Sequence, residues 1–259
     1  MNFREISKLD LNYYEINREE RNYAAILFTA LCKTSNSLIF LNRCGFEINT
    51  LGPDYGIYFE YAFLRDLWFQ LDNNEIKKDV IRNLLKIKEI DSILNKPIVE
   101  INTIFGTSGE PSIKYIESPS KWSITKYSDN FDNEDFIKVC RFKWSFNIKP
   151  DIVIHLDKNT ALCIEAKYES GEGQYPGSKK DQMIFANRDI ERAGQTELQK
   201  YMMEDLLGIK TKFMFLVSKK DSSSSHKVIN WKEAFEILEI SELPFFAQEM
   251  IKKISNTAV

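Results

Sequence analysis

The chain has 259 residues, of which 43% are hydrophobic and 13% aromatic, and its formal net charge at pH 7 is −3. This is enough apolar material for one large domain, or for a core domain with an added helical subdomain, and it excludes a disordered chain. The acidic balance excludes a protein that coats nucleic acid with a basic surface. Any contact with DNA must therefore rely on local positive charge, metal ions or partner subunits.

The cysteines and the N-terminal sequence argue against several further classes of protein. The four cysteines are scattered without a CxxC pair, and there are only two histidines, which argues against a structural zinc site. The first residues, "MNFREISKLD", are mixed and charged and do not predict a signal peptide. No apolar stretch approaches the roughly 20 residues that span a bilayer. The expected compartment is a reducing cytoplasm.

The N-terminal part of the chain is predicted to be mainly helical. Residues 17–33 keep helical spacing, with Asn17 as the N-cap and Glu20 at the reciprocal position of a capping box. Residues 37–48 are predicted to be extended or a loop, and "LGPDYG" marks a turn. Further helices are predicted over 56–71 and 73–90, and three segments are predicted as strands, at 97–105, 121–127 and 142–148.

The C-terminal part predicts an α/β order. Two apolar runs within 151–167, separated by the polar turn "DKNT", predict a buried β-hairpin. A Gly-rich loop follows, which we interpret as a mobile loop near the mouth of the site. The later segments are a helix over 181–207 ending at Gly208, a strand over 212–218, the serine run "DSSSS", and helices over 231–240 and 243–254. The crossover helix implies a parallel strand pair.

Charged residues at one end of this hairpin suggest chemistry. Alternation along the strands places Asp151 on one face of the first strand, and Glu165 and Lys167 on one face of the second. In an antiparallel hairpin, these three side chains meet at one edge of the sheet. Two carboxylates this close repel unless a cation lies between them or one is protonated. Oxygen ligands suit Mg²⁺, with the carbonyl of Ala166 as a further candidate ligand, and Lys167 would then lie beside a metal-bound water.

The stretch resembles the PD-(D/E)XK nuclease superfamily. Pro150-Asp151 matches the "PD" element and Glu165-Ala166-Lys167 matches the "(D/E)XK" element, with 13 residues between the two acids. The resemblance covers roughly residues 50–220. It implies that Asp151 and Glu165 bind catalytic Mg²⁺, with Mn²⁺ as a substitute, and that Lys167 assists the attacking water. It also implies a restriction-endonuclease-like α/β core, a central mixed β-sheet flanked by helices, within 51–259. That domain would carry an insertion at about 72–140, and residues 1–50 would be a helical N-terminal extension packed on the core.

Two further residues extend the resemblance. The superfamily often carries a glutamate on the helix before the sheet, and Glu60, four residues after Gly56, matches that setting. On the predicted helix, Glu60 would lie in the apolar stripe and would need the metal as a partner. Several branches place a glutamine followed by a tyrosine on the helix after the lysine strand. The spacing of Gln195, Gln199 and Tyr201 departs from that pattern, and we favour Gln195 for its inward position.

Each of these residues also has a purely structural interpretation. Asp151 could be a turn residue, Glu165 with Lys167 a surface ion pair, and Glu60 the partner of an arginine such as Arg65. His155 shares the face of Asp151 but is more often a satisfied core residue.

The leading hypothesis is a metal-dependent DNA endonuclease of restriction, repair or phage defence. The expected partners are DNA and either a second copy of the chain or a larger defence or repair complex, and no membrane. The alternatives are a non-catalytic binding or scaffold module with the nuclease fold, and a nuclease acting on RNA.

Overall fold

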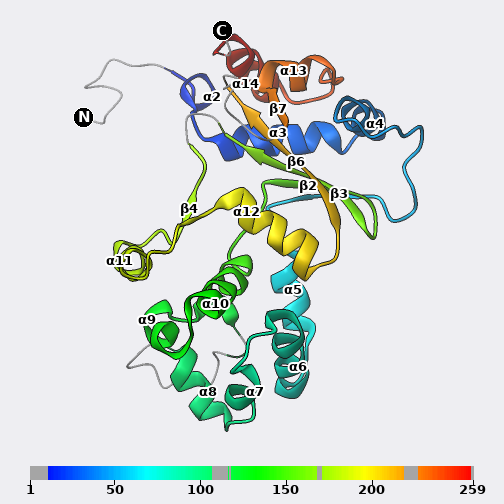
Figure 1. The fold of residues 1–259 in the computed structure, drawn as a ribbon. Helices are drawn as coiled ribbons and strands as arrows, with labels where there is room; N and C mark the ends of the chain where they lie inside the picture. The colour runs from blue at the N-terminus through cyan, green and yellow to red at the C-terminus, as the bar shows by residue number, and fades with distance from the viewer. Residues whose placement is uncertain (1–10, 107–115, 117, 168–170, 219–226, 258–259) are drawn as a thin grey trace. The chain divides into compact units, whose positions relative to one another are not determined.

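The computed structural model describes residues 11–106, 116, 118–167, 171–218 and 227–257 (Figure 1). They form an α/β protein with a central mixed five-stranded sheet flanked by helices. Contacts divide the chain into two compact units. Unit 1 comprises 1–61, 150–171 and 211–259, and unit 2 comprises 62–149 and 172–210. The insertion predicted at 72–140 falls inside unit 2. The serine run lies outside the described residues, as does part of the Gly-rich loop predicted after 167.

The sheet has the strand order β1-β2-β3-β6-β7. β1 pairs antiparallel with β2 and β2 with β3, whereas β6 and β7 are parallel. The backbone N–H of Lys167 donates to the carbonyl of Leu216 at 2.7 Å, which joins the end of β3 to β6. The hairpin and the strand at 212–218 are therefore confirmed, and the observed parallel pair is β6 with β7. The strand bounds are β1 Gly56–Phe59, β2 Ile152–Asp157, β3 Thr160–Ala166, β6 Lys210–Val217 and β7 Lys227–Asn230.

One face of this sheet is covered by helices (Figure 1). Side chains alternate between the two faces of a strand, so one face of the sheet carries Ile152, Ile154, Leu162 and Ile164. All four are buried in one cluster with apolar side chains of the helices. Burial of each such side chain contributes roughly 1.5–3 kcal/mol. The covering helices are α3 (Glu20–Leu31), α4 (Thr34–Arg43), α13 (Trp231–Glu236) and α14 (Phe245–Thr257), with α2 (Tyr13–Ile16) beside α14. The two C-terminal helices are thereby confirmed.

Two N-terminal predictions are wrong. The segment 37–48, predicted to be extended or a loop, begins in helix α4, where Ser37, Phe40 and Leu41 are buried at helical spacing, and only residues 44–48 lie outside a helix. The predicted helix over 56–71 is strand β1 followed by α5 (Phe63–Gln70). Pairing with β2 decides the strand, and Glu60 ends it with a left-handed backbone, φ 52°. Helix α3 begins at Glu20, and Asn17 instead accepts a hydrogen bond from the N–H of Glu19.

Unit 2 is mainly helical and has its own aromatic core. The rings of Phe105 and Trp122 stack with centroids 4.2 Å apart, and Trp68 meets Phe142 edge to face. The three segments predicted as strands within 97–148 are therefore mostly helical. The predicted helix at 73–90 is split between α6 and α7. The helices are α6 Asn74–Leu85, α7 Ile90–Leu94, α8 Ile98–Phe105, α9 Ile124–Tyr127 and α10 Asn133–Ser145, with 3₁₀ turns at Pro119–Lys121 and Ser128–Asn130.

The predicted long helix over 181–207 is also interrupted. It consists of α11 (Lys179–Asn187), then α12 (Gln195–Lys200), which continues as a π-helical segment, Tyr201–Leu206. A two-stranded sheet of β4 (Gln174–Tyr175) and β5 (Ala193–Gly194) accompanies the break. The predicted end at Gly208 is confirmed, since Gly208 has the left-handed backbone, φ 68°, typical of a helix C-terminus.

Among the described residues, no single helix is long and apolar enough to cross a membrane. The pair α3 and α4 meets the length and composition requirement only jointly, across a 111° bend, and both helices contribute buried side chains to the core of unit 1.

Candidate active site

The backbone holds Asp151 in place at the start of β2. The N–H of Ala166, at the end of β3, donates to Oδ2 of Asp151 at 2.8 Å. On the other side, the N–H of Glu60 donates to the carbonyl of Asp151 at 2.9 Å, and the N–H of Tyr61 donates to the carbonyl of Pro150 at 3.0 Å. The carboxyl group is thus fixed at the ends of two central strands, rather than on an edge strand.

Glu165 and Lys167 form a buried ion pair next to it. The Nζ atom of Lys167 lies 2.7 Å from Oε1 of Glu165, and the two side chains are only 13% and 6% exposed. The backbone of Lys167 is held too, because its carbonyl accepts a hydrogen bond from Nε1 of Trp231 at 3.1 Å. The alternative of a solvent-exposed surface pair is therefore wrong. The structure brings Asp151, Glu165 and Lys167 together, as the hairpin alternation predicts.

The pKa of Asp151 reflects the closeness of Glu165 and Lys167. Burial raises the pKa of Asp151 to about 7, and the negative charge of Glu165 adds to the rise. The hydrogen bond from Ala166 and the charge of Lys167 act against that rise but do not cancel it. Among the described residues, Oδ1 of Asp151 accepts no hydrogen bond. The site therefore holds a carboxyl group that is close to half-protonated at neutral pH.

Lys167 remains an ammonium in this setting. Burial disfavours its charge, but Glu165, followed by Glu20 and Asp151, outweighs burial and raises the pKa of Lys167. Burial also raises the pKa of the Cys163 thiol, and Glu165 and Asp151 reinforce this rise, so Cys163 is an inert neutral neighbour.

Glu20 is a site residue that the sequence patterns assigned only to helix capping. It is the first residue of α3, and its charge raises the pKa of both Asp151 and Lys167. Glu20 therefore adds negative charge to the surroundings of Asp151 and Lys167. The available signal was an acidic residue at the start of an apolar helix that precedes the sheet in the chain.

The structure places the other predicted site residues, Glu60 and Gln195, differently from the three residues of the hairpin. Glu60 is not on a helix; its Oε1 lies 3.4 Å from Nε of Arg21, so its arginine partner differs from the suggested Arg65. Its backbone pairing beside Asp151 keeps it a predicted supporting residue. Gln195 is the first residue of α12 in unit 2, where its N–H donates to the carbonyl of Gly173 at 2.8 Å. Its catalytic role remains a prediction, as does ligation by the carbonyl of Ala166.

His155 lies farther along the face of Asp151 and is bound to Tyr61. Its Nε2 is 2.7 Å from the hydroxyl oxygen of Tyr61, and the ring of Tyr58 packs against it edge to face. Burial lowers the pKa of His155. A neutral, hydrogen-bonded imidazole of this kind fits the structural interpretation of this residue.

A divalent cation at this site would need side-chain ligands from the protein. Within the described part of the chain, no group of three or more His, Cys, Asp or Glu side chains is arranged to hold a metal ion. Mg²⁺, however, commonly uses only one or two protein carboxylates and keeps several waters. Oδ1 of Asp151, which accepts no hydrogen bond from a described residue, and the neighbouring Glu165 fit such a site.

Comparison of the chain with protein-family models, curated proteins and solved structures gave no match.

Proposed function

We propose that this protein is a Mg²⁺-dependent nuclease that hydrolyses phosphodiester bonds of DNA. The observation that carries the proposal is the partly buried carboxyl group of Asp151, with its pKa raised to about 7, beside the Glu165–Lys167 ion pair. Neighbouring carboxylates that repel each other and destabilise the folded protein are more often part of a functional site than of a purely structural one. The resemblance to the PD-(D/E)XK superfamily gives these three residues a coherent set of roles.

The architecture supports a restriction-endonuclease-like fold. The candidate acids and the lysine lie on β2 and β3, the middle strands of a mixed sheet that carries helices on at least one face. Helix α3 precedes the sheet in the chain and brings Glu20 to the same end of the hairpin. An endonuclease acting in restriction, repair or phage defence is the narrower form of the proposal.

The residues divide the chemistry as follows. Asp151 and Glu165 would hold Mg²⁺, with Glu20 and Glu60 in support. A bound Mg²⁺ lowers the pKa of a coordinated water and neutralises charge on the scissile phosphate. Because the pKa of Lys167 is raised, this side chain is an ammonium at neutral pH. Lys167 therefore acts as a hydrogen-bond donor that stabilises negative charge on the phosphate.

The test is cleavage of plasmid and linear DNA with Mg²⁺, with Asp151→Ala and Lys167→Ala beside the unsubstituted protein. Each variant is expected to lose at least ~100-fold in rate, the usual effect of removing a group that stabilises transition-state charge. Asp157→Ala and Lys158→Ala are matched controls, because these exposed residues lie at the turn of the same hairpin. Equal rates in the unsubstituted protein and in both site variants would refute the proposal. An RNA of the same sequence distinguishes the two nucleic acids.

A binding module with this fold is the second candidate. The observation that favours it is that Lys167 and Glu165 neutralise each other directly and Asp151 has a backbone donor, so part of the site is satisfied by the protein itself. Thermal unfolding with and without Mg²⁺ distinguishes the two functions. A nuclease is stabilised as Mg²⁺ is raised above its dissociation constant, and a module without a metal site is not.

A further inference from the structure

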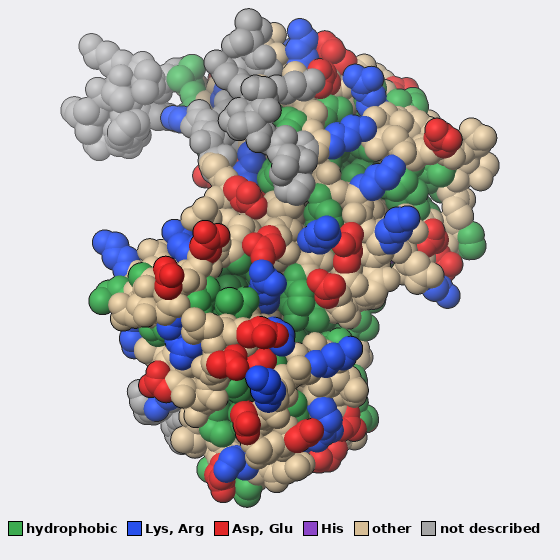
Figure 2. Space-filling view, viewed as in Figure 1, with side chains coloured by type: hydrophobic (Ala, Val, Ile, Leu, Met, Phe, Trp, Pro, Cys, Tyr) green, Lys and Arg blue, Asp and Glu red, His purple; other side chains and the backbone are tan. Residues whose placement is uncertain are grey.

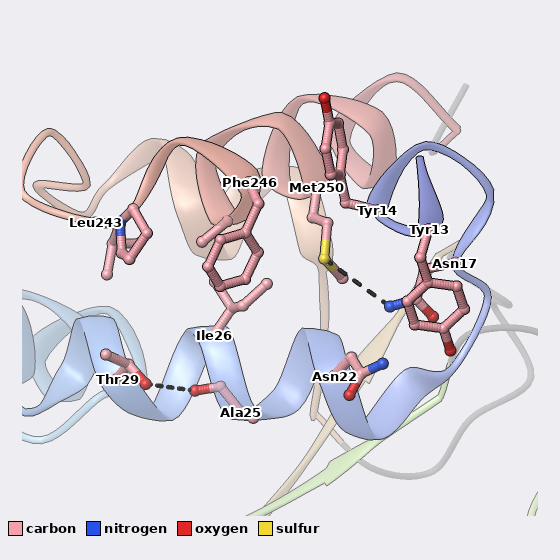
Figure 3. Close-up of a pocket in the computed structure, with 12 residues that line it drawn as sticks. Tyr13, Tyr14, Asn17, Asn22, Ala25, Ile26, Thr29, Leu243, Phe246 and Met250 are labelled. Atoms are coloured by element: carbon pink, nitrogen blue, oxygen red, sulfur yellow. Dashed lines mark hydrogen bonds between the residues drawn. The ribbon is translucent and has the colours of Figure 1, made fainter. Parts of the chain in front are cut away.

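A cavity of about 430 Å³ lies in unit 1, beside helix α3 (Figure 3). It is walled by α2, α3 and α14, all of which belong to the same unit. Pockets that bind small molecules usually have volumes of about 300–1,000 Å³ and mostly apolar walls. The size of this cavity therefore suits a small organic ligand.

Apolar side chains form most of the wall. Ile26 of α3 faces Phe246 and Met250 of α14 across the cavity (Figure 3). Two rings at the cavity are poorly covered: Tyr13 is 63% exposed and Phe246 is 51% exposed. Exposed aromatic rings gathered around a hollow are typical of binding sites rather than of ordinary surface. Their flat faces favour an aromatic ligand.

The polar groups restrict the charge of the ligand. The described residues that line the cavity include Asn17, Asn22 and Thr29, but none of the lining residues is Lys, Arg, Asp or Glu. A phosphate or carboxylate would therefore lose its hydration without gaining a counterion. The lining selects an uncharged ligand.

Asn17 supplies a buried donor. The residue is only 2% exposed, and its Oδ1 accepts the N–H of Glu19 at 2.8 Å. For Nδ2, the partner among the described residues is the thioether of Met250 at 3.9 Å, which is a weak acceptor (Figure 3). A buried amide N–H is costly when it lacks a good acceptor. An oxygen or ring nitrogen of a ligand would provide one.

We propose that this cavity binds an uncharged aromatic molecule that carries a hydrogen-bond acceptor, such as an aryl amide or a neutral heterocycle. The ring packs between Tyr13, Ile26 and Phe246, and the acceptor takes the N–H of Asn17. Binding at this cavity is measured directly, so nuclease activity is not needed to detect it.

The test uses protein labelled with ¹³C at the methionine methyl groups, with indole-3-carboxamide as the probe. Met250 lines the cavity, whereas Met214 is buried in the core of the same unit and serves as the internal reference. The methyl resonance of Met250 is expected to shift saturably with the probe, and that of Met214 is not. Indole-3-carboxylate, which is charged, and cyclohexanecarboxamide, which has no aromatic ring, are each expected to bind about tenfold more weakly.

Two variants check the geometry. Asn17→Asp keeps the acceptor for Glu19 but removes the donor, and it is expected to weaken binding of the probe about tenfold. Ala25→Trp fills the cavity and is expected to abolish binding, whereas Ile39→Trp, on an exposed position of α4, is the control. The proposal is overturned if Met250 does not respond to the probe, or if a folded Ala25→Trp variant binds it as well as the unsubstituted protein does.

Discussion

Asp151 is partly buried beside a second carboxylate, and no ion pair joins it to another described residue. Such an arrangement disfavours the charged form of the folded protein until a cation is present. The hydrogen bond from the N–H of Ala166 fixes the carboxyl group but does not neutralise it. A residue of this kind can be removed with a gain in stability and a loss of function.

Asp151→Asn is therefore expected to stabilise the metal-free protein. The amide oxygen keeps the acceptor for Ala166 and removes a charge that burial and Glu165 disfavour. At pH 8 the free energy of unfolding should rise by about 1 kcal/mol or more, while DNA cleavage is lost. Urea denaturation measures the first effect. The exposed Asp157→Asn is the control, and a lower stability of Asp151→Asn would contradict this reading of the site.

The same residue gives a pH dependence. The pKa of Asp151 is raised from 3.8 to about 7 in the folded state, so the folded protein holds this proton more tightly than the unfolded chain does. Its contribution to stability is therefore fully present below about pH 4 and is lost as pH rises through about 7. The difference in unfolding free energy between Asp151→Asn and the unsubstituted protein should be larger at pH 8 than at pH 5. A difference independent of pH would contradict the raised pKa.

Glu20 has a separate test. Its charge acts on both Asp151 and Lys167, so Glu20→Gln is expected to lower the rate of DNA cleavage about tenfold or more, as loss of a supporting carboxylate commonly does. Glu19→Gln is the matched control, because Glu19 is the exposed neighbour just before α3. Equal effects of the two substitutions would mean that Glu20 acts only through general surface charge.

The site residues that the sequence could reveal are those that lie close together in the chain. Asp151, Glu165 and Lys167 belong to one hairpin, and strand alternation alone places them on one face. Glu20 lies more than a hundred residues earlier in the chain, and only the packing of α3 on the sheet brings it to the site. No periodic pattern carries that information. Gln195 has the same difficulty, because it lies on an element of unit 2.

At the scale of elements, the hairpin, β6 and the C-terminal helices were predictable because their apolar periods are unambiguous. The segments at 97–105 and 142–148 were misread because their β-branched and aromatic residues also favour strands. Their helical form is set by the aromatic core, in which Phe105 and Phe142 both contact Trp122. The break between α11 and α12 likewise accompanies the pairing of β4 with β5, which local propensity does not encode.

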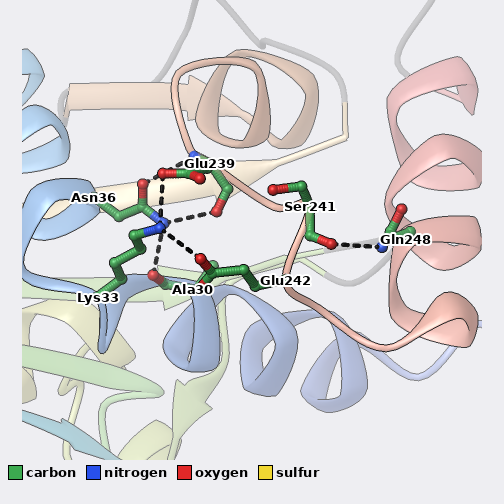
Figure 4. A network of polar contacts seen from close by, with 7 residues as sticks. All are labelled: Ala30, Lys33, Asn36, Glu239, Ser241, Glu242 and Gln248. Atoms are coloured by element: carbon green, nitrogen blue, oxygen red, sulfur yellow. Dashed lines mark hydrogen bonds and ion pairs between the residues drawn. The ribbon is translucent and has the colours of Figure 1, made fainter.

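A polar network fixes α4 to the segment after α13 (Figure 4). Asn36 is 1% exposed; its Nδ2 donates to the carbonyls of Ala30 and Glu239 at 2.9 and 3.0 Å, and its Oδ1 accepts the N–H of Glu239 at 2.9 Å. Lys33 adds ion pairs to Glu239 and Glu242, but these are largely exposed.

Asn36→Leu should therefore destabilise the protein by about 2 kcal/mol or more, because it leaves the N–H and the carbonyl of Glu239 without their partner, whereas the carbonyl of Ala30 keeps the N–H of Lys33. Lys33→Ala should change stability far less, since exposed ion pairs contribute little. Urea denaturation of both variants measures the difference. Similar losses in the two variants would show that the ion pairs, and not the amide, hold this junction.

At the scale of the whole molecule, the tryptophans separate the two units. Trp68, Trp122 and Trp144 lie in unit 2, whereas Trp231 lies in unit 1 and donates its hydrogen bond to the backbone of Lys167. Each unit therefore carries its own spectroscopic reporter, and the one in unit 1 touches the candidate active site.

Protein labelled with 5-fluorotryptophan uses this distribution. Addition of Mg²⁺ is expected to shift the ¹⁹F resonance of Trp231 and to raise its midpoint of denaturation, since ligand binding to the folded form stabilises the unit that binds. The three resonances of unit 2 should respond much less. Assignment by single Trp→Phe variants identifies each signal. A uniform response of all four resonances would mean that Mg²⁺ does not act through the hairpin.

The hydrogen bond between the N–H of Tyr61 and the carbonyl of Pro150 has a consequence for how this chain can diversify. It brings Tyr61 and Pro150, the residues on either side of 62–149, next to each other. Both lie beside the paired strands β1 and β2. The entropy of closing so long an excursion changes only slowly with its length. Lengthening or shortening the segment should therefore leave β1 and β2 in register, so that its length can change without rebuilding the candidate active site.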